Sequence, residues 1–422
     1  MGFQQGLSGL NTASKNLDVI GNNVANSGTV GFKTGQAQFA DVFAASLSGA
    51  GTSPVGLGAK VATVVQQFTQ GNITATSNPL DIAINGGGFF RLSNAGTITY
   101  ARNGQFQLDK DGFIVTSQGL RLTGYPANAN GLINTGALAD LQISTADIAP
   151  QATGTAVTGA QGVLGQLNLD SRVSPPATAP FDYADPTSYN NSTALTVYDS
   201  LGSPHTYSLY FVKTAPNSWN VYSTVTNPAG TTTDLSSGGT VPLGSLAFDT
   251  AGNLTTAMPF SQSIAAAALG TGGANLTYDV DFGGTTQYGG TFSVNTLSQD
   301  GFSIGKLAGF NVGADGIVVG RYTNGQAKNL GQVVLAGFRN PQGLQPLGNN
   351  QWAETSTSGV ALVGEPGSSG AYGPLQSSAV EDSNVDLTQE LVNMITAQRV
   401  YQANAQTIKT QDAVLQTLVN LR

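Results

Sequence analysis

The sequence predicts a mainly β protein with α-helical termini, in which helices from the two ends of the chain pair with each other. Three observations predict this class. Apolar residues recur at helical spacing near both ends. Turn signals separate short alternating runs throughout the middle, and Gly occupies 55 of the 422 positions. A chain of this length exceeds one ordinary core, so we expect two to four domains.

Residues 3–24 have the 3-4 apolar spacing of an amphipathic helix. The expected stripe consists of Phe3, Leu7, Leu10, Leu17 and Val24. Gly6, Gly9, Gly21 and several asparagines weaken the helical preference, so this helix would be marginally stable alone. We therefore expect it to need neighbouring helices.

The C-terminal tail repeats the pattern over a longer run, for which Ser383 or Asn384 is the expected cap. One stripe contains Leu387, Leu391, Met394, Tyr401, Ala405, Ile408, Leu415 and Val419. A second stripe contains Val392, Ile395, Val400, Val414 and Leu418, and one partner helix cannot cover both stripes. Periodicity alone also allows an ordinary intramolecular pair that closes one domain.

Strand and turn signals fill the region between the helices. Asp111-Gly112, Asp315-Gly316 and Asn324-Gly325 are hairpin signals. A Pro-rich break at 174–180 precedes a central block with expected strands at 194–198, 206–213 and 219–225.

The predicted domains are nested. The helical domain comprises 1–33 and 374–422, extended linkers occupy 34–70 and 364–373, a discontinuous β domain comprises 71–144 and 285–363, and an all-β domain is inserted at 145–284.

The composition argues against several classes of protein. Only 9% of residues are charged and the net charge is −8, which disfavours nucleic-acid binding. The chain contains no Cys, and this excludes disulfides and thiolate metal sites. Residues 1–10 lack the pattern of a cleaved signal peptide, and we expect no membrane insertion.

Residues that could carry catalysis are sparse. His205 is the single histidine, and a surface or half-buried position in a strand is the favoured interpretation. Residues 85–88 (NGGG) precede a strand rather than a helix, which favours a tight turn with positive φ over a phosphate loop. We therefore predict no enzyme activity, no catalytic or metal-binding residues and no cofactor.

Both ends carry long motifs of one known family. Residues 17–26 (LDVIGNNVAN) and 29–33 (TVGFK) resemble the N-terminal signature of bacterial flagellar rod and hook proteins. Residues 383–387 (SNVDL), 390–395 (ELVNMI), 398–399 (QR) and Tyr401 resemble the C-terminal signature of the same axial family. The resemblance continues at 81–84, 88–90, 102–106 and 331–338, but the central block gives no motif as firm.

The inserted block favours a hook subunit within this family, because rod subunits resemble the flanks without a large insertion. A distal rod subunit is the alternative. A different class, a secreted β-rich protein that binds surfaces through aromatics such as Trp219, Tyr207 and Tyr210, also stays open.

The resemblance implies a helical homopolymer in the flagellar hook and basal body, outside the cell. It implies flagellar type III export without a cleaved signal peptide, and contacts with the distal rod, the hook cap and the hook-filament junction protein. The terminal helices would form an inner tube, the flanking β domain a middle layer and the insertion an outer layer. The polymer would be a curved, flexible universal joint that transmits motor torque to the filament.

Two groups of residues are expected to matter for assembly. The self-assembly group on the terminal helices contains Phe3, Leu7, Leu10, Leu17, Val24, Leu387, Leu391, Met394, Tyr401, Ile408 and Leu415. The turn that follows the first helix contains Asn22, Asn23, Ala25, Asn26, Gly31, Phe32 and Lys33.

Overall fold

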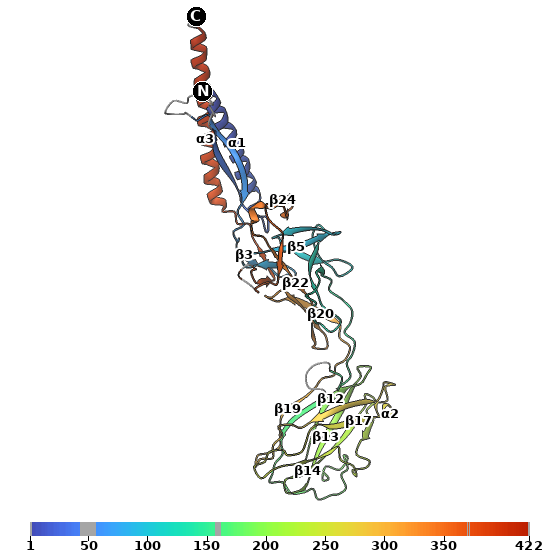
Figure 1. Ribbon diagram of the computed structural model, residues 1–422. Helices are drawn as coiled ribbons and strands as arrows, with labels where there is room; N and C mark the ends of the chain where they lie inside the picture. The colour runs from blue at the N-terminus through green and yellow to red at the C-terminus, as the bar shows by residue number, and fades with distance from the viewer. Residues whose placement is uncertain (1, 43–55, 157–161, 369, 371, 421–422) are drawn as a thin grey trace. The chain divides into compact units, whose positions relative to one another are not determined.

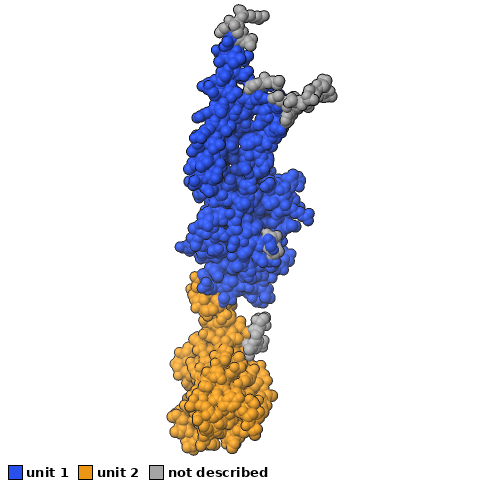
Figure 2. Space-filling model, turned by 90° about the vertical axis from the view of Figure 1, so that its left-hand side faces the viewer, with its two compact units in different colours: residues 1–145, 309–321, 327–422 blue, residues 146–308, 322–326 orange. Residues whose placement is uncertain are grey.

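The computed structural model describes residues 2–42, 56–156, 162–368, 370 and 372–420. Two compact units are present, shown in different colours in Figure 2. Unit 1 comprises Met1–Thr145, Gly309–Arg321 and Ala327–Arg422, and unit 2 comprises Ala146–Ala308 and Tyr322–Gln326. The predicted class, mainly β with helical termini, is confirmed.

Two long helices from opposite ends of the chain lie side by side in unit 1 (Figure 1). They are α1 (Gly2–Ala25) and α3 (Leu387–Asn420), named together the helix pair. The expected caps of α3 are wrong, because Asp386 Oδ1 accepts the N–H of Gln389 at 3.1 Å and so satisfies a free donor of the first turn.

A β ribbon packs along α1 where extended linkers were expected. Strand β1 (Gly35–Val42) pairs antiparallel with β2 (Gly58–Gln66), and both strands contact α1. The expectation of a linker at 34–70 is therefore wrong for these strands, because their backbone groups pair with each other along the helix. Residues 43–55 of this span lie outside the described part of the chain.

A 13-stranded sheet follows, with the main path β20-β21-β22-β9-β5-β6-β25-β24. Its strands are β5 (Phe89–Asn94), β6 (Thr97–Ala101), β7 (Phe106–Leu108), β8 (Ile114–Thr116), β9 (Arg121–Pro126), β10 (Ala139–Asp140), β20 (Leu307–Val312), β21 (Ile317–Tyr322), β22 (Ala327–Val333), β23 (Leu335–Gly337), β24 (Gln345–Gly348), β25 (Gln351–Ala353) and β26 (Leu362–Gly364). A 3₁₀ turn, η1 (Pro341–Gly343), precedes β24. The predicted hairpin turns are confirmed, with Gly112, Gly316 and Gly325 at φ of 82°, 81° and 80°.

The strands that lead into α3 pair with strands near the start of the chain. β27 (Leu375–Ser377) pairs with β4 (Ile82–Ile84), and β28 (Ala379–Glu381) pairs with β3 (Ile73–Ala75). The tight turn after β4 is confirmed, because Gly86 and Gly88 have φ of 126° and 114°. This pairing fixes the entry of α3 beside the exit of α1.

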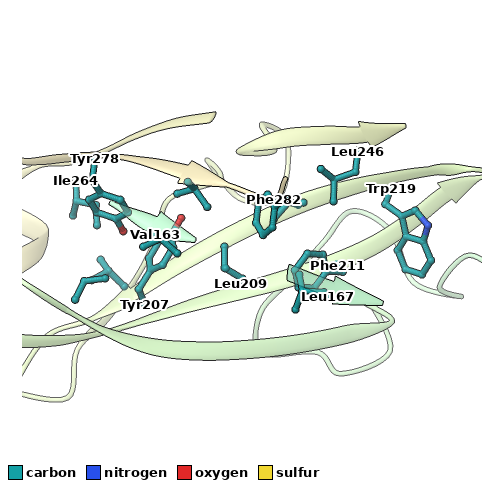
Figure 3. Packing of buried hydrophobic residues seen from close by; sticks show 14 of the residues in the cluster. Val163, Leu167, Tyr207, Leu209, Phe211, Trp219, Leu246, Ile264, Tyr278 and Phe282 are labelled. Carbon is teal, nitrogen blue, oxygen red and sulfur yellow. The ribbon is translucent and has the colours of Figure 1, made fainter. Parts of the chain in front are cut away.

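Unit 2 is a sandwich of two sheets around one apolar core (Figure 3). The first sheet has the order β17-β18-β11-β19, and the second has the order β12-β13-β14-β15 with β16 also paired to β14. The strands are β11 (Val163–Asn168), β12 (Asn191–Tyr198), β13 (Pro204–Ala215), β14 (Ser218–Thr226), β15 (Thr232–Asp234), β16 (Gly244–Ala247), β17 (Phe260–Ile264), β18 (Leu276–Asp281) and β19 (Ser293–Gln299), and a short helix α2 (Ala266–Leu269) follows β17. The expected strands at 194–198, 206–213 and 219–225 are confirmed as parts of β12, β13 and β14.

Alternation along these strands fills the core from both sheets. Tyr207, Phe211 and Trp219 are fully buried. Phe282, which directly follows β18 of the opposite sheet, packs against Phe211 with ring centroids 5.9 Å apart (Figure 3). Residues 285–308, assigned from sequence to the flanking β domain, lie in unit 2 because β19 pairs with β11 over its whole length.

Candidate self-assembly surface and its buried junction

The face along which α1 and α3 touch is built from small residues. A Cβ on Gly6 would lie 3.0 Å from Ile408 Cγ1, and one on Gly9 would lie 2.6 Å from Asn404 Oδ1. Ala397, two helical turns before Asn404 on the same side of α3, is 5% exposed. Glycines that weaken an isolated helix therefore let these two helix backbones approach closely.

The large apolar residues of the predicted self-assembly group mostly lie off this contact face. In the single chain Phe3, Leu7, Leu387, Leu391, Tyr401 and Leu415 are exposed, and Leu10, Leu17, Val24, Met394 and Ile408 are half-buried. Ile408 packs against Gly6, so it is brought to α1. On α1 the residues that contact α3, Gly6 and Gly9, each precede a residue of the predicted stripe, Leu7 and Leu10, by one position. One position corresponds to a rotation of about 100° around the helix axis. The single chain thus leaves an apolar surface open to solvent.

Asparagine side chains fix the end of α1. Asn23 is buried, its Nδ2 donates to the Gly35 carbonyl at 2.8 Å, and its Oδ1 accepts the Gly35 N–H at 2.9 Å. Asn26 Nδ2 donates to the carbonyl of Asn22 at 3.0 Å, which closes the last helical turn. Ala25 is the last helical residue and is exposed. The first strand of the ribbon is thereby tied to the helix.

The turn that follows runs close to the β domain. Gly31 has φ of 71°, and a Cβ there would lie 2.6 Å from the backbone nitrogen of Asn103, so both conformation and space require glycine. Phe32 is half-buried, and its N–H donates to the Thr29 carbonyl at 3.2 Å. Lys33 then turns inward and is 1% exposed.

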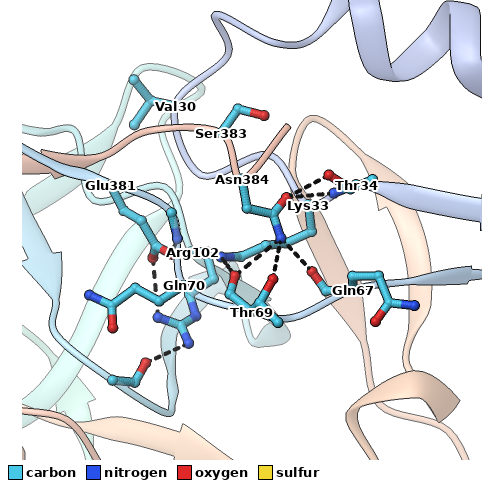
Figure 4. Close-up of polar contacts among 12 residues, drawn as sticks. Val30, Lys33, Thr34, Gln67, Thr69, Gln70, Arg102, Glu381, Ser383 and Asn384 are labelled. Atoms are coloured by element: carbon cyan, nitrogen blue, oxygen red, sulfur yellow. Dashed lines mark hydrogen bonds and ion pairs between the residues drawn. The ribbon is translucent and has the colours of Figure 1, made fainter. Parts of the chain in front are cut away.

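Lys33, Arg102 and Glu381 form a buried ionic cluster, here named the junction (Figure 4). Lys33 Nζ donates to Glu381 Oε1 at 2.6 Å, and Arg102 Nη1 donates to Glu381 Oε2 at 3.1 Å. The backbone completes the set: the N–H of Gly71 donates to Oε1 at 2.9 Å, and the N–H of Gly31 donates to the Glu381 carbonyl at 2.8 Å. The junction joins the exit of α1, the ribbon and the strand that leads to α3.

The junction contains two cationic side chains and one carboxylate, so the carboxylate cannot neutralise both positive charges. Burial lowers the pKa of Lys33 and of Arg102 below their ordinary values, and Glu381 opposes the shift in both cases. Carbonyl oxygens accept one further hydrogen bond from each cation: Lys33 Nζ donates to the Thr69 carbonyl at 2.7 Å, and Arg102 Nη2 donates to the Gly86 carbonyl at 2.7 Å. Arg102 Nε is buried and has no hydrogen-bond partner among the described residues. Removing the carboxylate would leave two buried cations with neutral acceptors only.

Asn384 adds a neutral bridge beside the junction (Figure 4). Its Oδ1 accepts the backbone N–H of Thr34 at 2.8 Å, and its Nδ2 donates to the carbonyls of Gln67 and Thr69 at 2.8 and 3.2 Å. The residue expected to cap α3 instead ties the C-terminal segment to both strands of the β ribbon at the end where Gly35 pairs with Gln66.

Sequence reasoning missed Glu381 and Arg102 as site residues. Arg102 lies within the family motif at 102–106, and Glu381 lies just before the motif at 383–387. Their importance depends on a contact 348 positions apart between Lys33 and Glu381. The scarcity of charge, 9% of residues, is the one signal that could have drawn attention to them.

His205 is structural, and the expected surface or half-buried position is wrong. It is 1% exposed, and its Nε2 lies 3.2 Å from Asp199 Oδ2. The same carboxylate accepts the N–H groups of Leu201 and Ser203 at 2.9 and 2.8 Å, so it organises the turn between β12 and β13.

Two other kinds of site are absent from the described residues. Among these residues, no three His, Cys, Asp or Glu side chains are grouped so that they could hold a metal ion. In the same part of the chain, no helix combines the length and the apolar character needed to cross a membrane.

Known proteins match this chain along its whole length. It is 45% identical to the flagellar hook protein FlgE of Salmonella typhimurium over 435 residues, which cover 100% of both chains. It is 44% identical to that of Escherichia coli K12 over 432 residues, again covering 100% of both. The chain belongs to the flagellar hook protein FlgE family.

A more distant hook protein and four domain families also match this chain. The FlgE protein of Borreliella burgdorferi is 34% identical over 455 residues, covering 99% of this chain and 98% of the other. Domain families match at 3–33 (flagella basal body rod protein), 83–163 (flagellar hook protein FlgE/F/G D1 domain), 168–302 (flagellar basal body protein FlaE D2 domain) and 376–421 (flagellar basal body rod FlgEFG protein C-terminal). Lys33 and Glu381 lie inside the two terminal matches.

A solved structure agrees with the fold of the hook protein family. The flagellar hook protein FlgE2 of Helicobacter pylori aligns with a TM-score of 0.51 at 14% identity, covering 73% of this chain and 100% of the other. At that identity the likeness supports the fold alone.

Proposed function

We propose that this chain is the repeating subunit of a bacterial flagellar hook, a curved and flexible tube that acts as a universal joint between motor and filament. Membership of the hook protein family supports the flagellar role. The observation that carries the assembly mechanism is the exposed apolar surface of the helix pair.

The helix pair supports the assembly mechanism because many of its large apolar side chains are not covered within the single chain. Its exposed apolar residues include Phe3, Leu7, Leu391, Val392, Ile395, Val400 and Leu415, each more than two-fifths exposed. Covering the exposed part of such a side chain contributes about 1 kcal/mol. Because these residues lie on more than one side of α3, several neighbouring copies are needed to cover them. We therefore propose that residues 1–33 and 374–422 form the inner tube.

Unit 2 supports a different role in the polymer. It closes an apolar core of its own, and the chain as a whole has few charges to impose fixed long-range pairing. Many weak neutral contacts can exchange as a polymer bends. We propose that unit 2 provides outer contacts that slide, while the subunit keeps its internal fold.

Further partners and the route of export are proposals that rest on family membership. We propose the distal rod, the hook cap and the hook-filament junction protein as neighbours, and the flagellar type III apparatus as the exporter. Cells lacking this protein are expected to show a rod without a hook by electron microscopy. Loss of the rod itself would contradict the assignment.

Truncation tests the assembly mechanism directly. The full chain is expected to form tubes in kosmotropic salt, whereas variants lacking residues 1–30 or 385–422 should stay soluble and β-rich by circular dichroism. Electron microscopy and sedimentation measure the difference. Tubes formed by either truncated variant would refute the role of the helix pair.

A further inference from the structure

A cleft opens between α1, β1 and α3 in unit 1. Its volume is about 650 Å³. Apolar walls come from Ala13 and Ile20 of α1, Phe39 of β1, and Ala397 and Val400 of α3. The contact of small residues leaves this space unfilled, and its size suits side chains of another helix.

One charged group, Glu390 of α3, lines this cleft. Its Oε2 is buried and has no hydrogen-bond partner among the described residues. Within the same residues Glu390 makes no ion pair. A carboxylate oxygen removed from water without a donor is costly, so a cation that enters the cleft would be favoured.

Arg399 offers a matching cation on the opposite side of the same helix. It is exposed and makes no ion pair within the described part of the chain. Nine residues separate it from Glu390, and at about 100° per residue the two side chains point about 180° apart. They therefore cannot pair within one helix.

The surroundings of Arg399 also match the walls of the cleft. Val392 and Ile395 precede it by seven and four positions, so they share its face of α3, and they are 53% and 52% exposed. Val392, Ile395 and Arg399 thus form one surface patch with two apolar side chains and one guanidinium. We name it the Arg399 patch. A guanidinium is suited to a carboxylate because it can donate two parallel hydrogen bonds.

We propose that the cleft of one copy receives the Arg399 patch of a neighbouring copy, with Glu390 binding Arg399 between subunits. The inference rests on the polymeric role proposed above and deepens it. The two surfaces differ and lie on opposite sides of α3, so the contact is head-to-tail. A head-to-tail contact that does not close on itself propagates as a helical polymer.

Charge reversal tests the pairing in the full chain. Glu390→Arg and Arg399→Glu should each raise the critical concentration for tube formation at least about tenfold, measured by sedimentation. The double variant E390R/R399E should recover most of this loss. An equimolar mixture of the two single variants should also assemble, because each cleft then meets a patch of opposite charge. Lys409→Glu, on the same exposed helix, is the matched control and should assemble like the parent chain.

The outcomes separate the pairing from the polymeric role itself. If the parent chain forms no tubes under any condition, the proposed function fails. If the parent polymerises but either single variant matches it, or if the double variant and the mixture fail to recover while circular dichroism shows unchanged helix, the pairing is refuted. Recovery of E390R by K409E in place of R399E would refute Arg399 as the partner.

Discussion

Unit 2 buries its largest apolar side chains inside the single chain, whereas the helix pair leaves most of its own exposed. Trp219, Tyr207 and Phe211 are fully buried between two sheets. In the helix pair the contact is made by Gly6, Gly9 and other small residues, and large residues face solvent. Large side chains stabilise folding in one region and remain available for association in the other.

The difference separates two properties of the chain. Burial inside the monomer contributes to the free energy of unfolding. Exposed apolar surface contributes only when a neighbour covers it. Changes in unit 2 should therefore alter unfolding, and changes on the outer faces of the helix pair should alter polymerisation.

The largest expected effect tests this separation with two aromatic side chains. Trp219→Ala should lower the free energy of unfolding by about 3 to 5 kcal/mol, because it empties a filled core position. Phe3→Ala should leave unfolding nearly unchanged but weaken tube formation. Denaturant unfolding followed by circular dichroism, together with sedimentation of polymers, measures both. If Phe3→Ala destabilised the monomer as strongly as Trp219→Ala, the comparison would be wrong.

The junction provides the next test, because it anchors the helix pair by charge rather than by apolar burial. Glu381→Gln should destabilise unit 1 by about 3 kcal/mol, since Lys33 and Arg102 stay buried without a carboxylate. Part of that loss should be regained as the pH rises, because the lowered pKa of Lys33 lets it lose its proton in the folded state first.

The matched control for the junction is Glu365→Gln. Glu365 is exposed and makes no ion pair among the described residues, so its replacement should change stability by less than about 0.5 kcal/mol. Equal effects of the two changes in thermal unfolding would show that the junction is energetically unimportant.

Alanine substitutions at two glycines of α1 should have smaller effects on stability, and the two effects should differ from each other. Gly9→Ala places a Cβ 2.6 Å from Asn404 Oδ1, so Asn404 must move and lose its hydrogen bond to the Val400 carbonyl. Gly21→Ala meets nothing within 4 Å and gains helical propensity. The first variant should be less stable than the second by about 1 to 2 kcal/mol, measured by thermal loss of helical ellipticity. Equal stabilities of the two variants would mean that the contact between α1 and α3 does not require the absence of a side chain at Gly9.

Alkaline pH gives the mildest test and acts on unit 2. Burial raises the pKa of Tyr207 and of Tyr278 above the ordinary 10.0. Their neutral forms are favoured in the folded state, so this contribution is complete below pH 10 and declines as the pH rises toward the folded pKa. Tyr207→Phe should flatten the loss of stability above pH 10. An unchanged slope in denaturant titrations across that range would contradict the assignment.

Local patterns were sufficient to predict the terminal helices, the turns at Asn324-Gly325 and the strands of unit 2, because each depends on neighbouring residues. The contact face of α1 was not predictable, because periodic large residues suggest a contact that Gly6 and Gly9 make instead. The boundary of unit 2 was misplaced for a related reason. The pairing of β19 with β11 joins segments more than a hundred positions apart and leaves no local signal.

The site was predicted less completely than the fold. Lys33 was expected in a turn, but its partner Glu381 could be found only after β28 was paired with β3. His205 was misplaced because alternation along β13 does not reveal which face of that strand the second sheet covers.

The position of Glu381 has a mechanical consequence. Its carbonyl holds Gly31 at the exit of α1, its side chain holds Lys33, and α3 begins six residues later. The junction therefore clamps the exit of α1 and the entry of α3 to the same β strands. Tension or twist applied to either helix reaches the β strands through the junction and the Asn384 bridge beside it, and the two helices are loaded together even though they are the first and last elements of the chain.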